Sequence, residues 1–142
     1  MSLLTDLRAH LVADSGFSAI TTRVRLYRSE QSDTEPRMVI HQISGDHKHH
    51  MTAATGKAIA RIQLDCYGTS PVGAEALAEV VRQALDGFRG VMNSGVFISM
   101  CHLDSERSSY TPPLEGGSPE GGVDVVQIDY LIGWSVSIPT FA

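Results

Sequence analysis

The segment that most constrains the fold is a long alternating run near the C-terminus. Apolar residues recur at every second position, which is the period of a β-strand with one buried face. This face is Val126, Ile128, Tyr130, Ile132, Trp134, Val136 and Ile138, with Asp124 as its polar exception at the start. Thirteen residues would span about 40 Å, about twice the usual strand. Such a strand is hard to pair fully within one small sheet, so we expect part of it to pair with or cover another subunit.

Three more segments have strand character, and a short extended piece ends near Tyr27. Residues 38–44 carry apolar residues on both sides, which is typical of a strand covered on both faces. Residues 58–67 alternate strictly, so they predict a half-buried antiparallel strand. In residues 96–106 the alternation places Val96, Ile98, Met100 and His102 on one side.

Two helices are predicted. Leucines at helical spacing indicate one from Leu3 to Leu11, with Gly16 suited to cap its end. The second begins after Ser70-Pro71, a capping hydroxyl followed by proline at the first helical position. Its apolar stripe is Ala74, Leu77, Ala78, Val81, Leu85 and Phe88, and Gly87 marks its end.

The order of these elements shows no βαβ alternation. We therefore predict an α+β fold: a mainly antiparallel sheet of four to five strands with two helices packed on one face. Residues 1–142 should form a single domain, with flexible loops at about 28–36, 45–56 and 107–123 because polar, Gly and Pro residues dominate there.

Composition excludes several classes of protein. The net charge is −5, from 11 basic and 16 acidic residues, which argues against general electrostatic binding to nucleic acid but not against DNA passing by. The two cysteines, Cys66 and Cys101, lie in apolar runs, so packing and a reducing compartment are expected. No apolar run is long enough for a transmembrane helix, and the N-terminal residues do not resemble a secretory signal. We expect assembly in the cytoplasm.

A few residues suggest chemistry. Asp46, His47, His49 and His50 are metal-ligand types, but their spacing matches no closed zinc motif, so a solvated loop is favoured over a metal site or a pH-sensitive contact. The Gly-rich run at 116–122 lacks the lysine and helix of a phosphate loop. Neither cysteine is predicted at a helix N-terminus, where its pKa would fall. The sequence thus predicts no enzyme, no cofactor and no resident metal.

Four polar residues fall on the outer side of the two clearest strands. They are Arg61, Asp65, Gln127 and Asp129. The plain interpretation is a wet sheet surface, and the sharper one is a subunit interface or a face lining a lumen. The sharper interpretation predicts that charge reversal at Asp129 alters oligomerisation more than folding.

Several local sequences resemble the phage tail-completion, or tail-to-head joining, family, which includes tail terminator proteins. They are the Leu-rich start (Leu3 to Ala13), residues 23–27, residues 36–45, Ala60-Arg61-Ile62-Gln63-Leu64-Asp65-Cys66-Tyr67-Gly68 followed by the helix, and residues 127–134. The resemblance covers nearly the whole chain.

This resemblance implies a structural subunit of a siphophage-type tail. It implies a homo-oligomeric ring, commonly a hexamer, at the head-proximal end, contacting the tail tube protein and the head-connector protein, with DNA as passing cargo and no membrane. The expected location is the tail of a virion or phage-like particle. The alternatives are another head–tail connector or tube subunit and a small metal-binding module that uses His47, His49 and His50.

Overall fold

The computed structural model describes residues 3–28, 34–49, 51, 54–92, 95–111, 123–136 and 138. Within them the elements are α1 (Leu3–Ala13), α2 (Ser15–Ser18), β1 (Val24–Leu26), β2 (Arg37–His49), β3 (Ala54–Gly68), α3 (Pro71–Leu85), β4 (Gly90–Met92), β5 (Val96–Thr111) and β6 (Val123–Ser135). The six strands form one sheet in the order β1-β2-β3-β6-β5-β4. The predicted α+β class is confirmed, and the strand and helix numbers are corrected to six and three in the described part of the chain.

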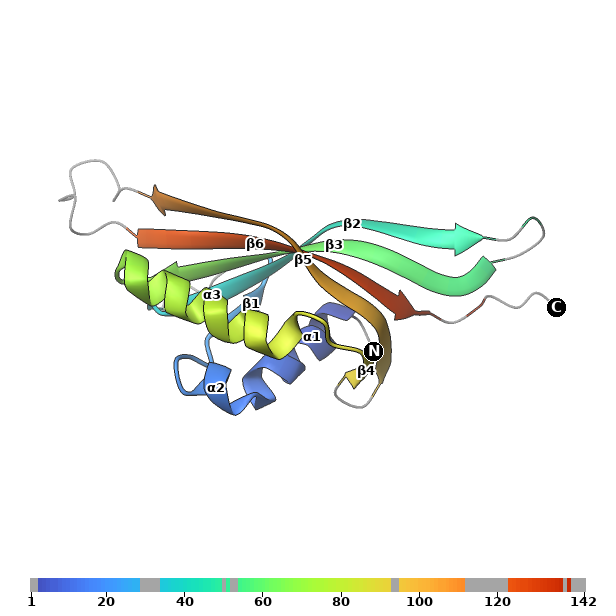
Figure 1. Ribbon diagram of the computed structural model, residues 1–142, viewed down its shortest axis with the longest axis horizontal. Helices are drawn as coiled ribbons and strands as arrows, with labels where there is room; N and C mark the ends of the chain where they lie inside the picture. The colour runs from blue at the N-terminus through green and yellow to red at the C-terminus, as the bar shows by residue number, and fades with distance from the viewer. Residues whose placement is uncertain are drawn as a thin grey trace.

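The sheet is mixed rather than purely antiparallel. β1 runs parallel to β2, while β2, β3, β6, β5 and β4 pair antiparallel in turn. The three helices lie on one side of this twisted sheet (Figure 1). Their apolar side chains meet the alternate residues of the strands in one hydrophobic cluster, which includes Leu7, Leu77, Ile62 and Tyr130. The opposite side of the sheet carries no helix in the described chain.

The helix starts follow the sequence signals closely. Ser70 caps α3 by accepting a hydrogen bond from the Gly73 backbone N–H at 3.0 Å, and Pro71 follows at the first helical position. The prediction that Gly16 caps the end of the first helix is wrong, because α1 ends at Ala13 and Gly16 lies inside α2. Asp14 caps that short helix by accepting from the Phe17 backbone N–H at 2.9 Å.

The strands extend into two predicted loops. β2 runs to His49 and β3 begins at Ala54, so the predicted loop at 45–56 is wrong at both ends. β5 likewise continues to Thr111, inside the predicted loop at 107–123, and residues 112–122 lie outside the described part. Polar composition misled here because cross-strand pairing, rather than local preference, holds these strand ends in place.

A register shift changes which side chains of β5 face the core. Between Ile98 and Met100 the pairing with β6 slips, and Cys101 is fully buried while Met100 is only half-buried. The predicted shared face of Val96, Ile98, Met100 and His102 is therefore wrong beyond Ile98. A bulge inserts one residue, so the side chains that follow it change face. The second shift, between Leu103 and Ser105, restores the original alternation, and Glu106 is again on the helix-covered side.

Candidate functional site

The uncovered face of the sheet is the most organised polar surface of the described chain. Arg61, Asp65, Gln127 and Asp129 all lie on it, because Ile62 and Leu64 between them turn toward the helices. In the β3–β6 register Asp65 is opposite Gln127, and Gln63 is opposite Asp129. The structure thus places the four predicted residues on one face.

Asp129 is the centre of this surface. Its Oδ2 atom lies 3.4 Å from the Arg61 guanidinium and 3.5 Å from that of Arg107, and it accepts a hydrogen bond from the Ser105 hydroxyl at 3.3 Å. Only 8% of Asp129 is exposed, although no helix covers it. The side chains of β3 and β5 therefore shield this carboxylate, and two cations compensate its charge.

Asp65 forms a second group on the same face. One carboxylate oxygen lies 3.1 Å from the His41 Nε2 atom, and the other accepts a hydrogen bond from the Gln63 side chain at 2.8 Å. The Tyr27 ring approaches His41 edge-on at a centroid distance of 5.9 Å. This group joins β2 to β3 as the Asp129 group joins β3, β6 and β5.

Two partners of this surface, Asp104 and Arg107, were not predicted from the sequence. Arg61 donates to Asp104 at 2.7 Å, and this contact raises the pKa of the guanidinium. Arg107 donates to Gln127 at 3.1 Å and to Gln63 at 3.4 Å, which connects the two groups. The strict alternation of residues 58–67 places Gln63 on the same outer face as Arg61 and Asp65. Asp104 and Arg107 could not be placed, because they follow the β5 bulge and Arg107 fell in a predicted loop.

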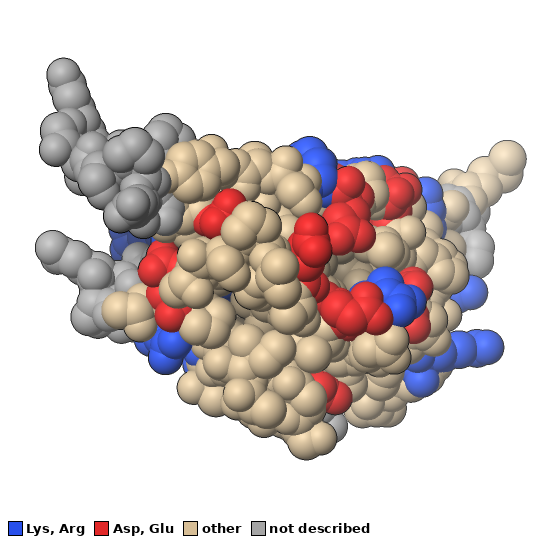
Figure 2. Space-filling view, turned by 60° about the vertical axis from the view of Figure 1, so that its left-hand side comes forward, with Lys and Arg blue, Asp and Glu red and all other residues tan. Residues whose placement is uncertain are grey.

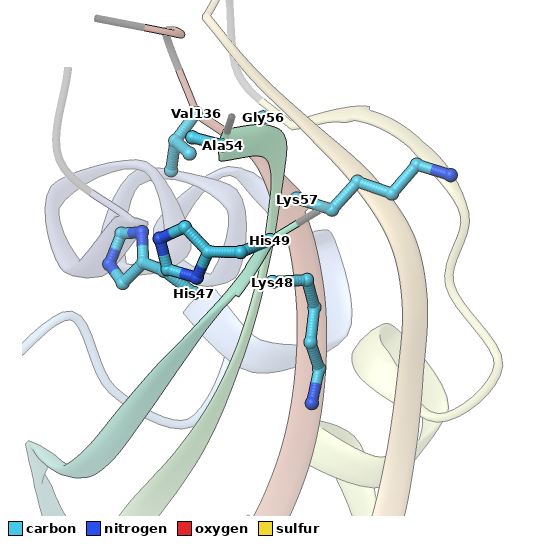
Figure 3. A pocket seen from close by; sticks show the side chains of 7 residues that line it. All are labelled: His47, Lys48, His49, Ala54, Gly56, Lys57 and Val136. Atoms are coloured by element: carbon cyan, nitrogen blue, oxygen red, sulfur yellow. The ribbon is translucent and has the colours of Figure 1, made fainter. Parts of the chain in front are cut away.

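The histidine-rich segment lies at the far end of β2. Figure 3 shows the His47 and His49 rings on one side of the strand pair, with Lys48 and Lys57 pointing away from them. These residues line a hollow of about 330 Å³ together with Val136. Asp46 is paired with Lys48 at 2.5 Å, and this hydrogen bond lowers the pKa of the Asp46 carboxyl. In the described part of the chain no three His, Cys, Asp or Glu side chains are placed to hold a metal ion, and His50 lies outside that part.

The two cysteines lie on the helix-covered side of the sheet, both fully buried and unpaired. Burial raises the pKa of the Cys66 thiol, and it raises the pKa of Cys101 to about 12. A thiol with a raised pKa holds little of the reactive thiolate at neutral pH. Of the helices that the structure describes, none has the length and apolar composition to cross a membrane.

Comparison with known proteins agrees with the resemblance. The family model "Tail completion protein gp17" matches residues 5–113. A chain from the structure titled "Virion of native gene transfer agent (GTA) particle" has a similar fold, with a TM-score of 0.63 and 14% identity over 94% of this chain and 96% of that one. A search of curated proteins finds no match. Because the family model covers most of the sequence, the chain belongs to the tail completion protein gp17 family and is a structural subunit of the tail of a phage or phage-like particle.

Proposed function

We propose that this subunit forms a closed homo-oligomeric ring, a hexamer, at the head-proximal end of the tail. The ring terminates the tail tube and joins it to the head connector, and DNA passes through its lumen. Family membership supports the position in the tail. The similar fold of a chain in a gene transfer agent virion supports a role inside an assembled particle.

The observation that carries the proposal is the contrast between the two faces of the sheet. One face bears three helices (Figure 1). The other bears the compensated network around Asp129. In a ring, the bulkier face has more room on the outside, where the circumference is larger. The network face, with Arg61, Asp65, Gln127 and Asp129, then lines the lumen.

The chemistry of this face suits a channel for DNA. Arg61 and Arg107 are engaged by Asp104 and Asp129, so their charges are compensated within the subunit. An array of free arginines would bind phosphates and hold the DNA in place. A face whose charges are compensated, on a subunit with a net charge of −5, does not hold a polyanion and lets it slide past.

The proposed role includes no catalysis and no cofactor. The two thiols, the strongest nucleophiles in the sequence, are buried, and burial raises the pKa of both above the range in which a reactive thiolate forms at neutral pH. The subunit therefore acts through its surfaces.

Ring formation is tested by measuring mass in solution by light scattering over a range of concentrations, with negative-stain imaging of the same sample. We expect one closed species of about six subunits, alone or on addition of tail tubes. A monomer under both conditions would overturn the ring. Gold labelling of tagged subunits in particles tests the position: label at the head-proximal end supports termination, and label along the tube would identify a tube subunit instead.

A further inference from the structure

Two strands of the sheet have long stretches of edge that no other described strand covers. β1 pairs with β2 only at Met38–Ile40, so β2 is uncovered from His41 to His49. β4 pairs with β5 only at Val96–Ile98. The Asp86-Gly87 turn then covers the next part of β5, since Asp86 accepts from the Leu103 N–H and Gly87 donates to the Cys101 carbonyl. The uncovered part of β5 therefore begins near Asp104. Uncovered strand edges are templates for pairing with another chain.

The directions of these two strands suit a repeat. β2, β3, β6 and β5 alternate in direction, so β5 runs opposite to β2. When neighbouring copies are related by rotation around a ring, the β5 edge of one copy would therefore meet the β2 edge of the next in the antiparallel sense. This contact uses two different surfaces, as a ring contact must.

The charges on the two edges also match. His47 of β2 is opposite Ala58 and Glu106 of β5 is opposite Ile128, so both side chains lie on the helix-covered side. Asp46 is opposite Ile59 and Arg107 is opposite Gln127, so these two lie on the network side. An antiparallel register that places His47 beside Glu106 also places Asp46 beside Arg107. One register therefore brings an acid and a base together on each side of the sheet.

We infer that β2 of one subunit pairs with β5 of the next, with His47 beside Glu106 and Asp46 beside Arg107, to form a continuous sheet around the ring. This inference rests on the proposed ring and names its subunit interface. The paired part of β2 lies between its two register shifts, at Gln42/Ser44 and His47/His49, and the paired part of β5 follows its second shift, at Leu103/Ser105. The segments Ser44–His47 and Ser105–Ser109 are thus regular where they would pair.

The stagger of the two edges is consistent with a closed sheet. Glu106 of β5 pairs with Ile128 of β6, which in turn pairs with Leu64 of β3, whereas His47 of β2 pairs with Ala58 of β3. The two edge positions are thus offset by six residues of β3, from Ala58 to Leu64, which is about 20 Å along the strands. The width of one four-strand repeat across the sheet is about 19 Å. The strands would then tilt by about 45° from the ring axis, which is the upper end of the usual range for closed sheets.

Exposed charges of both signs lie near the two edges. Figure 2, turned so that the left-hand side of Figure 1 comes forward, shows acidic side chains with a few basic ones among them. The exposed acidic residues of the β5 edge include Asp104 and Glu106. The β2 end carries His47, Lys48 and His49, with Lys57 beside them on β3. A second copy of this chain, rather than an unrelated acidic partner, supplies both signs of charge at matching positions.

Disulfide trapping in assembled rings or purified particles tests the pairing. Facing Cβ atoms of antiparallel strands lie about 5 Å apart, close to the separation that a disulfide requires. We expect the double variant His47→Cys/Glu106→Cys, treated with oxidised glutathione, to give a ladder of covalent oligomers, and either single variant to remain monomeric on a denaturing gel. The native cysteines are fully buried and provide a silent background. His47→Cys/Glu79→Cys, with the second thiol on the exposed side of α3, is the matched control.

The outcomes separate the interface from the ring. A ring of normal mass without a ladder would overturn the β2–β5 pairing and leave the ring intact. Absence of any ring, in solution and in particles, would overturn both.

Charge exchange provides a second measurement. Glu106→Lys should weaken association about tenfold, and adding His47→Glu in the same chain should restore most of it. Failure of the second substitution to restore association would count against this register.

Discussion

The two faces of β3 reach the same degree of burial by different means. Leu64 is fully buried beneath the helices, and its neighbour Asp65 is 5% exposed on the face that no helix covers. On the first face, apolar side chains from other elements exclude water. On the second, His41 of the adjacent strand and Gln63 of β3 itself contact the Asp65 carboxylate and shield it from water.

The two faces therefore contribute differently to the free energy of folding and to the placement of charged groups. Apolar burial contributes about 25 cal/mol per Å², so the helix-covered face supplies most of the folding free energy. An ion pair between partly exposed side chains, such as Arg61–Asp104, contributes little to stability because solvent screens it. The network face therefore fixes the positions of charged groups, which is what a surface facing DNA or a partner requires.

The largest expected effect comes from breaking the helix-covered face. Leu64→Ala should lower the free energy of unfolding by about 3 kcal/mol, because it removes buried methyl groups and leaves a cavity. Gln63→Ala, one residue away on the network face, is the matched control and should cost less than about 1 kcal/mol. Urea denaturation measures both, and equal losses would contradict the division between the faces.

A smaller effect is expected from the centre of the network. Asp129→Asn keeps the shape of the side chain but removes the charge between Arg61 and Arg107, and it should cost about 1 kcal/mol of stability. Charge reversal at Asp129 is a poorer test of oligomerisation than the sequence suggested. A lysine at this position would be nearly buried beside two guanidinium groups and would disturb folding as well.

The mass of the ring should not change in Asp129→Asn. Asp129 lies on β6, inside the sheet, and its partners come from its own subunit. Light scattering measures the mass of the ring and urea denaturation measures folding stability, so the two measurements together distinguish an effect on assembly from an effect on folding. Loss of the ring with unchanged stability would instead place Asp129 itself at a subunit interface.

The sequence was sufficient where a local pattern controls the structure. Strict alternation gave the buried face of β3, and Ser70-Pro71 gave the start of α3. The same alternation placed Arg61, Asp65, Gln127 and Asp129 on one face, because parity along a regular strand is enough to determine sidedness.

The remainder depended on pairing between distant segments. The bulges in β5 decide which side Cys101 and Arg107 face, and their positions follow from the register with β6. β1 was predicted as an extended piece, but its parallel pairing with β2 has no local signal. The near-complete burial of Asp129 likewise comes from side chains of β3 and β5.

The smallest expected effect concerns an ion pair outside both faces. Glu79 on α3 is bound by Arg82 through two hydrogen bonds and by Gln83 through one, which lowers the pKa of its carboxyl to about 2. Because the pKa is lower in the folded state than the usual 4.5, the contribution to stability is present above pH 4.5 and is lost as the pH falls toward 2.

Glu79→Gln should therefore reduce the pH dependence of the urea midpoint between pH 5 and about 3, while leaving the ring unchanged. Glu75→Gln, one turn earlier on the exposed side of α3, is the matched control. An equal change in both variants would show that the general charge of the helix, rather than the Glu79–Arg82 pair, sets this dependence. If Glu79→Gln lowered the free energy of unfolding at neutral pH by more than Asp129→Asn does, the charges of the network face would not be the more strongly constrained ones.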